Sequence, residues 1–363
     1  MRLVVVTQVV DADHPALAQT VDIVGALAAR CERVEVLCDR VGRHELPANV
    51  DFRTFAARSK PGRGLHFERA LATSLRGKPD GILVHMVPTF VTLAAPLVKA
   101  RRVPLLLWYT HWHASSSLRL ATRLADRILS VDRRSFPLDS PKARGIGHAV
   151  DTARFRPRVS ESRSPSASRE PLRLLALGRF ARWKGYGTML DGLSLALADG
   201  LDATLELRGP ELTDDERRHR AELAAQVAAD PQLAEHVTLA PPIVRDEIPG
   251  LLASADALLS ATEPRGAETL DKVVYEAAAC EVPVLASNTA LAEFLGGLPL
   301  ELRFRASDAQ DLARTLAALA AAGPDARAAA GAELRRRVER SHSLDSWADA
   351  VIGAVRELSR SPE

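Results

Sequence analysis

Short runs of valine, leucine and isoleucine alternate with longer amphipathic stretches along most of the chain. In the first half, the apolar runs predict strands buried on both faces: Leu3–Val6, Val34–Cys38, Gly81–His85, Pro104–Tyr109 and Arg127–Val131. Between them, apolar residues at helical spacing predict helices: Pro15–Arg30, Leu65–Leu75, Thr89–Ala100 and Ser116–Ala125. This alternation is typical of βαβ units and of a parallel, doubly wound sheet.

The alternation is interrupted at residues 156–171, which are rich in proline, serine and arginine, as is typical of a linker. A second series of strands then follows: Leu172–Leu177, Ala203–Leu207, Val237–Leu239, Ala257–Ser260, Val284–Ala286 and Leu300–Phe304. Helical spacing returns in the last part of the chain: Asp308–Ala322, Pro324–Arg340 and Ser343–Leu358, with Ser343 expected as a cap. The sequence therefore predicts an α/β fold with Rossmann-like domains over 1–155 and 172–342 and a final helix within 343–363.

Composition and charge narrow the class of protein. The length of 363 residues, with 47% hydrophobic and 26% charged residues, fits two globular domains. The net charge is +2 and the basic residues are dispersed, which argues against a nucleic acid partner. Cys31, Cys38 and Cys280 are expected to be free thiols, because they form no metal-type pair. No signal peptide and no apolar run of about 20 residues is apparent, so we expect a cytoplasmic protein without a transmembrane segment.

The segment Gly178–Gly185 follows the predicted strand Leu172–Leu177 directly and precedes a helix. Its two terminal glycines allow a tight turn, and a helix start presents N–H groups to an anion. Arg179 can grip phosphate oxygens with two donors and Lys184 can add a point charge. The segment therefore predicts a phosphate-binding turn, with a solvated surface turn as the alternative.

Two carboxylates, Glu268 and Glu276, lie eight positions apart, ahead of the predicted buried strand Val282–Ser287. A carboxylate can accept hydrogen bonds from two adjacent hydroxyls, as on a ribose or a hexose. This pair predicts a site for a polyhydroxylated ligand. The alternative is a loop carboxylate at 268 and a residue favoured by the helix dipole at 276.

Taken together, these motifs resemble the retaining glycosyltransferases of family 4, which have the GT-B fold. The resemblance is carried by Gly178-Arg179, Lys184-Gly185, the E-x7-E pair and the Ala-Cys-x-x-Pro-Val sequence at 279–284, and it covers most of the C-terminal half. It implies two Rossmann-like domains facing each other across a cleft, the first binding the acceptor and the second the nucleotide sugar. It also implies that the final helix packs back on the first domain.

The resemblance further implies roles for single residues. Arg179 and Lys184 would hold the donor's diphosphate, with Gly178 in the turn beside it. Glu276 would hold the ribose of the nucleotide, and Glu268 would contact the hydroxyls of the donor sugar.

The chain departs from the family pattern after Glu268, where a Gly-aromatic-Gly turn is common and Thr269-Leu270-Asp271 stands instead. Backbone amides there normally approach the donor, so Thr269 and Leu270 are donor-binding candidates whose side chains crowd or replace those contacts. Lys272 could add a phosphate contact, while Asp271 would pair with Lys272 or contact the sugar. Glu281, where the family usually has glycine, is expected to alter a turn only.

In the first domain, the predicted strand Pro104–Tyr109 ends in Thr110-His111-Trp112-His113. Catalytic and binding side chains gather at the carboxyl ends of parallel strands. By its spacing, His111 matches the family histidine that lines the sugar site, with His113 as the other possibility. A structural role for both is the alternative, and a metal site is disfavoured because no third ligand follows at suitable spacing.

Asp11-Ala12-Asp13 has the D-x-D form that holds a metal ion in another glycosyltransferase fold. Because His14 and a proline follow, we interpret it first as a loop that caps a helix. Asp11, Asp13 and His14 are secondary candidates for contacts to the acceptor, and no metal is predicted.

Two further basic segments have simpler interpretations. Lys60–Gly64 is expected to be a flexible loop rather than a phosphate cradle. The run at 335–337 is expected to be a solvated helical face, with peripheral membrane contact left open.

The predicted reaction is a metal-independent, retaining transfer of a hexose-type sugar from a nucleoside-diphosphate sugar to a hydroxylated acceptor, without a cofactor. Fixed cations at the leaving group suit the charge that develops on a departing diphosphate. The alternatives are a sugar-nucleotide epimerase, a phosphorylase of the same fold, and a non-catalytic sugar-nucleotide binder. A dehydrogenase is disfavoured because neither domain opens with G-x-G-x-x-G after its first strand.

Overall fold

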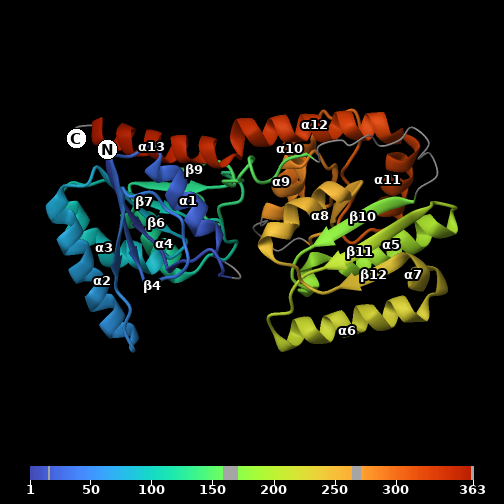
Figure 1. The fold of residues 1–363 in the computed structure, drawn as a ribbon, viewed down its shortest axis with the longest axis horizontal. Coiled ribbons are helices and arrows are strands. Elements are labelled where there is room, and N and C mark those ends of the chain that lie inside the picture. The colour runs from blue at the N-terminus through green and yellow to red at the C-terminus, as the bar shows by residue number, and fades with distance from the viewer. Residues whose placement is uncertain (15–16, 158–170, 264–270, 361–363) are drawn as a thin grey trace. The chain divides into compact units, whose positions relative to one another are not determined.

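The computed structural model describes residues 1–14, 17–157, 171–263 and 271–360 (Figure 1). The chain divides into two compact units, one formed by 1–151 with 341–363 and the other by 152–340. We call them unit 1 and unit 2 and describe each by itself.

Unit 1 is built on a parallel sheet whose strands, within the described residues, follow the order β5-β3-β1-β6-β7-β8-β9. Their bounds are β1 (Arg2–Val6), β3 (Arg33–Cys38), β5 (Val50–Thr54), β6 (Gly81–His85), β7 (Leu105–Trp108), β8 (Arg127–Ser130) and β9 (Ala143–Gly145). A short parallel pair, β2 (Val9–Val10) and β4 (Arg40–Val41), lies apart from this sheet. Every residue of β6 and β7 is buried, which explains why these strands are continuous apolar runs.

The helices of unit 1 are α1 (Gln19–Ala28), α2 (Lys60–Ser74), α3 (Pro88–Ala100), α4 (Ser116–Leu124) and α13 (Leu344–Arg360), with a 3₁₀ turn η1 (Leu75–Gly77). Three buried rings, Phe55, Phe67 and Phe90, pack within 4.8–5.4 Å of one another between α2, α3 and the sheet. Such aromatic contacts contribute strongly to a core because each ring buries a large apolar surface.

The last helix of the chain, α13, is part of unit 1 and packs on α1 (Figure 1). Arg30, two residues beyond the end of α1, donates to Asp345 at 2.8 Å and to Asp349 at 2.6 Å. The fully buried ring of Trp347 packs edge-on against Trp108 of β7, with centroids 5.5 Å apart. The Ser343 hydroxyl accepts the N–H of Ser346 at 3.0 Å, so the predicted cap of this helix is confirmed.

Unit 2 contains a second parallel sheet, with the order β12-β11-β10-β13-β14 in its described residues. The strands are β10 (Leu172–Leu177), β11 (Ala203–Arg208), β12 (Val237–Ala240), β13 (Ala257–Ser260) and β14 (Val284–Ala286). The helices are α5 (Tyr186–Ala198), α6 (Asp214–Ala229), α7 (Pro231–His236), α8 (Ile248–Ser254), α9 (Lys272–Ala279), α10 (Ala292–Leu295), α11 (Ala309–Ala321) and α12 (Gly323–Ser341). The 3₁₀ turns are η2 (Arg182–Lys184), η3 (Arg245–Glu247) and η4 (Thr289–Leu291).

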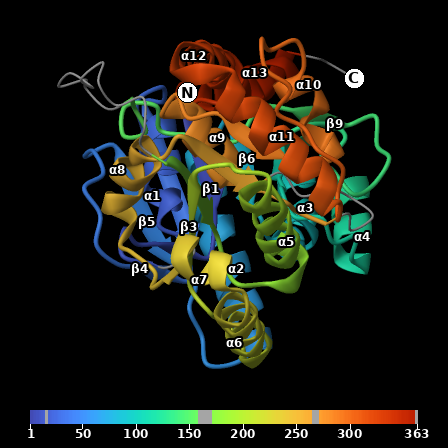
Figure 2. The same ribbon diagram turned by 90° about the vertical axis from the view of Figure 1, so that its right-hand side faces the viewer.

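Helices α5 and α11 of unit 2 lie side by side, as Figure 2 shows. A Cβ at Gly192 of α5 would lie 2.8 Å from the Leu312 side chain of α11, so glycine permits this close approach. The strand predicted at Leu300–Phe304 is not formed; the structure has an isolated bridge between Arg303 and Ala286 there.

The prediction of a loop at Lys60–Gly64 is wrong, because these residues form the first turn of α2. Ser59 caps that turn by accepting the N–H of Gly62 at 3.2 Å, and Pro61 occupies a position in the first turn that needs no donor. Propensity alone suggested a loop, but the cap and the proline favour a helix start.

The prediction of a solvated face at 335–337 is wrong for two of its three residues. Arg335 donates to the carbonyl oxygen of Phe155 at 3.1 Å and contacts that of Ala279. Arg337 donates to the carbonyl oxygens of Phe294 at 2.8 Å and of Gly296 at 2.7 Å. These guanidinium groups therefore tie α12 to neighbouring segments of unit 2.

Two general expectations can be compared with the structure. The three cysteines all lie in described ranges and are buried free thiols, and burial raises the pKa of Cys38 and of Cys280 to about 12. Across the described ranges, every helix is too short or too polar to span a bilayer.

Candidate active site

The candidate site begins where β10, the middle strand of the sheet in unit 2, ends. Gly178 follows directly: its N–H donates to the carbonyl of Arg208 at 3.0 Å, and its own carbonyl accepts the Tyr186 hydroxyl at 2.8 Å. The chain then passes through η2 to Gly185, which has a φ of +68°. A Cβ there would lie 2.0 Å from the carbonyl oxygen of Ala261, so both the conformation and the close approach require glycine.

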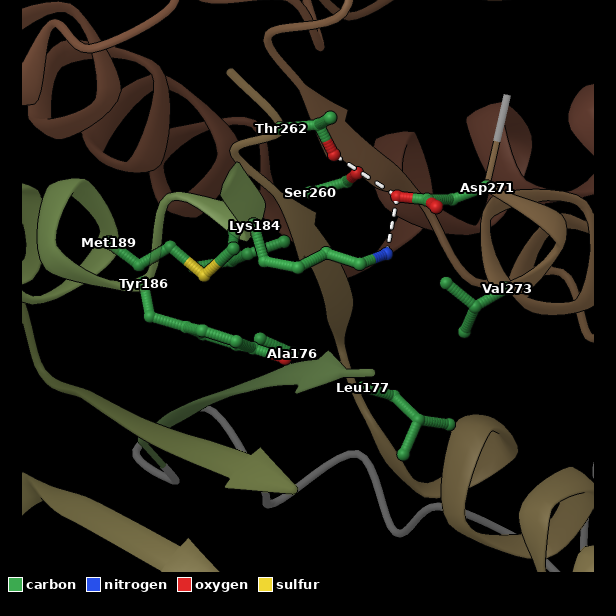
Figure 3. A pocket seen from close by; sticks show the side chains of 10 residues that line it. Ala176, Leu177, Lys184, Tyr186, Met189, Ser260, Thr262, Asp271 and Val273 are labelled. Carbon is green, nitrogen blue, oxygen red and sulfur yellow. Dashed lines mark hydrogen bonds and ion pairs between the residues drawn. The ribbon is translucent and has the colours of Figure 1, made fainter. Parts of the chain in front are cut away.

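Lys184, the last residue of η2, extends into a pocket at the carboxyl end of β10 (Figure 3). Its Nζ lies 2.7 Å from Oδ2 of Asp271, and the Thr262 hydroxyl donates to the same oxygen at 3.1 Å. The Lys184 and Asp271 side chains are only 14% and 13% exposed, so water screens this ion pair weakly. The Lys184 ammonium also lies 4.7 Å from the centroid of the Trp183 ring.

Arg179, the other predicted phosphate ligand, pairs with Glu216 at 3.3 Å. The Glu216 side chain is 5% exposed and also accepts the N–H of Leu212 at 2.6 Å, at the start of α6. Arg179 itself is 45% exposed. Because a guanidinium carries five N–H donors, Arg179 keeps donors for a ligand while paired with Glu216.

The third cation of the turn, Arg182, is directed to α6. It donates to both carboxylate oxygens of Glu222, at 2.8 and 2.9 Å. This pairing raises the pKa of Arg182 and lowers the pKa of Glu222. Arg182 is therefore held at the surface by its own partner, in contrast to Lys184.

Tyr186 lines this pocket, and its hydroxyl bonds to the first residue of the turn. Burial raises the pKa of its phenol above the ordinary value, and the carboxylates of Asp271 and Glu216 raise it further. The phenol stays protonated at neutral pH and donates to Gly178, which fixes the start of the turn. Gly178 and Lys184 converge here, since a Cβ at Gly178 would lie 3.4 Å from Cε of Lys184.

The remaining described residues that were predicted to bind the donor lie at or within helix α9. Asp271 occupies its N-cap position, and Lys272 and Glu276 lie within the helix. Asp271 was expected to pair with Lys272 or to contact the sugar. The structure pairs it with Lys184, and a contact to the sugar stays a prediction. Glu268, Thr269 and Leu270 lie outside the described residues, so their predicted roles stay predictions.

In unit 1, His111 and His113 follow β7, the strand predicted to end at the sugar site. Nδ1 of His111 accepts the N–H of His113 at 3.3 Å, and the Tyr109 hydroxyl donates to the carbonyl of His113 at 2.9 Å. The His111 ring is exposed and stacks on Trp112, with centroids 5.7 Å apart. These contacts set the loop conformation, while the roles of both imidazoles stay predictions.

In the described residues, the D-x-D segment is not the cap of helix α1, so its interpretation as the cap of that helix is wrong. Helix α1 begins at Gln19, and its N-cap residue makes no side-chain hydrogen bond. Asp13 instead accepts two hydrogen bonds from Arg43, at 2.8 and 2.6 Å, which lower the pKa of its carboxyl. Oδ2 of Asp11 lies 3.8 Å from Nη2 of Arg40.

His14 contributes to the same loop, since its Nδ1 accepts the N–H of Leu17 at 2.9 Å. Within the described residues, no cluster of three or more potential metal ligands occurs. The acceptor roles of Asp11, Asp13 and His14 stay predictions.

Sequence reasoning did not anticipate the partners of the predicted cations. Glu216, the partner of Arg179, and Thr262, which donates to the partner of Lys184, lie far from the turn in sequence and outside the motifs named above. The T-x-x-E spacing at 213–216 is a helix-start signal that would have located Glu216 at the first turn of α6. The departure from the family pattern at Asp271 was a visible signal, but it did not identify Lys184 as the partner.

Comparisons with known proteins show which proteins this chain is similar to. Residues 171–322 match the family described as Glycosyl transferases group 1. The GDP-mannose-dependent alpha-(1-6)-phosphatidylinositol monomannoside mannosyltransferase of Mycobacterium tuberculosis is 32% identical over 159 residues. That match spans 41% of this chain and 37% of the relative, so the aligned part is little more than a third of the relative's length.

Solved structures are similar over nearly the whole chain. HepE of Anabaena in complex with UDP has a TM-score of 0.76 at 16% identity, covering 98% of this chain and 100% of that one. A glycosyltransferase from Rickettsia africae has a TM-score of 0.75 at 14% identity, covering 99% and 100%. Sucrose-phosphate synthase from Thermosynechococcus elongatus has a TM-score of 0.73 at 18% identity, covering 98% of each chain.

Two parallel-sheet units of this kind define the GT-B fold, so the predicted fold class is confirmed. The resemblance to family 4 glycosyltransferases is confirmed as well, since residues 171–322 match the family described as Glycosyl transferases group 1. The facing arrangement of the two domains across a cleft stays a prediction.

Proposed function

We propose that this protein transfers a hexose-type sugar from a nucleoside-diphosphate sugar to a hydroxyl group of an acceptor, with retention of configuration and without a metal ion. The observation that carries the proposal is the position of Lys184, in a pocket at the carboxyl end of β10 and inside the segment that matches the glycosyltransferase family. The names of the similar proteins, one GDP-mannose-dependent and one solved with UDP, support a nucleotide-sugar donor.

In the proposed reaction, the bond between the anomeric carbon and the diphosphate oxygen breaks as the acceptor oxygen bonds to the same face of the sugar. The acceptor proton passes to an oxygen of the departing diphosphate, so no enzyme nucleophile is required. Negative charge grows on the diphosphate as the bond breaks, and cations fixed beside it stabilise the transition state more than the ground state.

Each candidate residue has its own proposed role in this reaction. Lys184 and Arg179 stabilise the leaving group, with Gly178 allowing the backbone of the turn to come close and Lys272 as a further cation at the start of α9. Glu276 orients the nucleoside, and His111 and Glu268 orient the sugar. Thr269 and Leu270 contribute through the backbone, and the acceptor is contacted by Asp11, Asp13 and His14.

The test begins with a donor panel of UDP-, GDP-, ADP- and dTDP-sugars, ranked by the rise in Tm that each produces, because a ligand bound to the native state stabilises it. Release of nucleoside diphosphate is then measured with pooled hydroxylated acceptors, with and without EDTA. NMR of the product gives the anomeric configuration. Acceptor-dependent release with a retained anomer, unaffected by EDTA, supports the proposal.

Three results would contradict it. An inverted product would exclude retention, and loss of activity in EDTA would exclude metal independence. Binding of a nucleotide sugar without transfer to any acceptor would favour the non-catalytic binder, which the comparisons do not favour.

A further inference from the structure

The side chain of Asp271, at the start of α9, bonds to residues outside that helix. It is the N-cap residue of α9, and aspartate at an N-cap usually accepts an N–H from the first turn of the helix. Its side chain makes no such capping hydrogen bond. Instead, its Oδ2 receives the Lys184 ammonium at 2.7 Å and the Thr262 hydroxyl at 3.1 Å (Figure 3).

The contacts of this oxygen resemble those of a bound phosphate oxygen. An anionic oxygen accepts one charge-assisted hydrogen bond from lysine and one from a hydroxyl, in a pocket where the Lys184 and Asp271 side chains are mostly buried. Lysine is a point charge, so a carboxylate that engages it strongly reduces what it offers to another anion. Arg179 differs, because it is more exposed and its five donors exceed what Glu216 occupies.

We propose that Asp271 is a specificity-determining residue that competes with the diphosphate of the donor for Lys184. The proposal rests on the function proposed above and adds a residue to it. A nucleoside diphosphate must displace the Asp271 carboxylate from Lys184, which weakens binding of both the donor and the nucleoside diphosphate left after transfer. Donors are then selected more by their sugar and base, and the product leaves faster.

The experiment compares Asp271→Asn with the wild-type chain by calorimetric titration of UDP and of GDP. Uridine and guanosine serve as probes that lack phosphate. Asp271→Gly is a second variant that removes the carboxylate in a different way, and circular dichroism with Tm measurements checks that both variants fold. Glu222→Gln is the matched control, because it neutralises a carboxylate that pairs with Arg182 outside the pocket.

We expect Asp271→Asn to tighten the Kd of the nucleoside diphosphate at least about fivefold, the equivalent of about 1 kcal/mol. The phosphate-free nucleosides and the Glu222→Gln variant should show less than a twofold change. In the double variant Lys184→Ala/Asp271→Asn, the gain from Asp271→Asn should shrink, since the lysine over which the anions compete is gone.

The possible failures are distinct. If Lys184→Ala weakens binding but neither Asp271 variant tightens it, competition is refuted and the proposed function stands. If the Asp271 variants tighten the nucleosides as much as the diphosphates, Asp271 acts on the base and the inference is also refuted. If neither the wild type nor any Asp271 variant binds a nucleoside diphosphate, both the inference and the proposed function fail.

Discussion

Replacing Lys184 with alanine removes the cation that the turn directs into the pocket, and it tests the proposed leaving-group role. Loss of one preorganised donor to a developing anion costs about 10²–10³ in kcat, or about 2.7–4 kcal/mol. A pair of unit charges 4 Å apart interacts by about 4 kcal/mol at an effective dielectric constant of 20, which is the same scale. We therefore take about 10²-fold as the smallest expected loss.

Removing Lys184 should also leave the Asp271 carboxylate without its cation, which adds to the expected loss of activity. Without Lys184, the Asp271 carboxylate keeps the hydrogen bond from Thr262 but loses its cation, in a site where both side chains are mostly buried. An uncompensated carboxylate then faces the diphosphate and repels it. We expect kcat/KM to fall about 10³-fold in Lys184→Ala.

The assay is acceptor-dependent release of nucleoside diphosphate with the best donor of the panel, at saturating and at low donor concentration. Arg182→Ala is the matched control, because Arg182 belongs to the same 3₁₀ turn but is held by Glu222 at the surface. This control should change kcat/KM by less than about threefold, given the small energies of exposed ion pairs. If Lys184→Ala retains more than a tenth of wild-type kcat/KM, or if both variants lose equally, the leaving-group role is refuted.

Three further predictions concern stability. Trp347→Ala should lower the free energy of unfolding by about 3–5 kcal/mol in urea titrations, since the ring is fully buried against Trp108. The Trp347→Phe variant should lose less than about 1.5 kcal/mol. Equal losses in the two variants would contradict this prediction. Gly185→Ala should lower the Tm and the activity together, because φ is +68° and a Cβ would lie 2.0 Å from a carbonyl oxygen, while Gly187→Ala, whose Cβ would meet nothing within 4 Å, should leave the Tm unchanged or higher. Burial lowers the pKa of His342 to about 3, with His148 contributing, so the unfolded chain binds more protons between pH 6.5 and 3 and stability falls as pH falls through that window. His342→Gln should flatten this dependence by about 1.4 kcal/mol per pH unit, as measured by urea unfolding at pH 6.5 and pH 5; an unchanged slope would exclude His342 as its source.

The parts of the fold that could be predicted are those in which burial shapes the sequence directly. Strands such as β6 are buried on both faces, so they are continuous apolar runs, and the predicted bounds at Gly81–His85 match the observed ones. Strand β5 (Val50–Thr54) was not predicted, because its residues are only partly buried and polar and apolar types mix in it. The start of α2 was missed because a cap and a proline outweighed the two glycines that follow.

For the candidate site, the sequence located the turn but not the partners of its cations. The turn could be recognised because glycine, cation and strand end lie within one short segment, as a local motif. The pairing of Lys184 with Asp271 joins residues that are distant along the chain, and it depends on how η2, β13 and α9 meet in three dimensions. The same holds for Arg335 and Arg337, which a basic run alone does not distinguish from a solvated face.

Helix α13 has a consequence for how the protein is made. Unit 1 includes strand β1 near residue 1, yet Trp347 and the partners of Arg30 are synthesised only after the whole of unit 2. During translation the sheet of unit 1 must therefore wait with an uncovered apolar face at Trp108, while the segment that becomes unit 2 can already collapse around its own sheet. A nascent chain of this protein would complete its second half before its first.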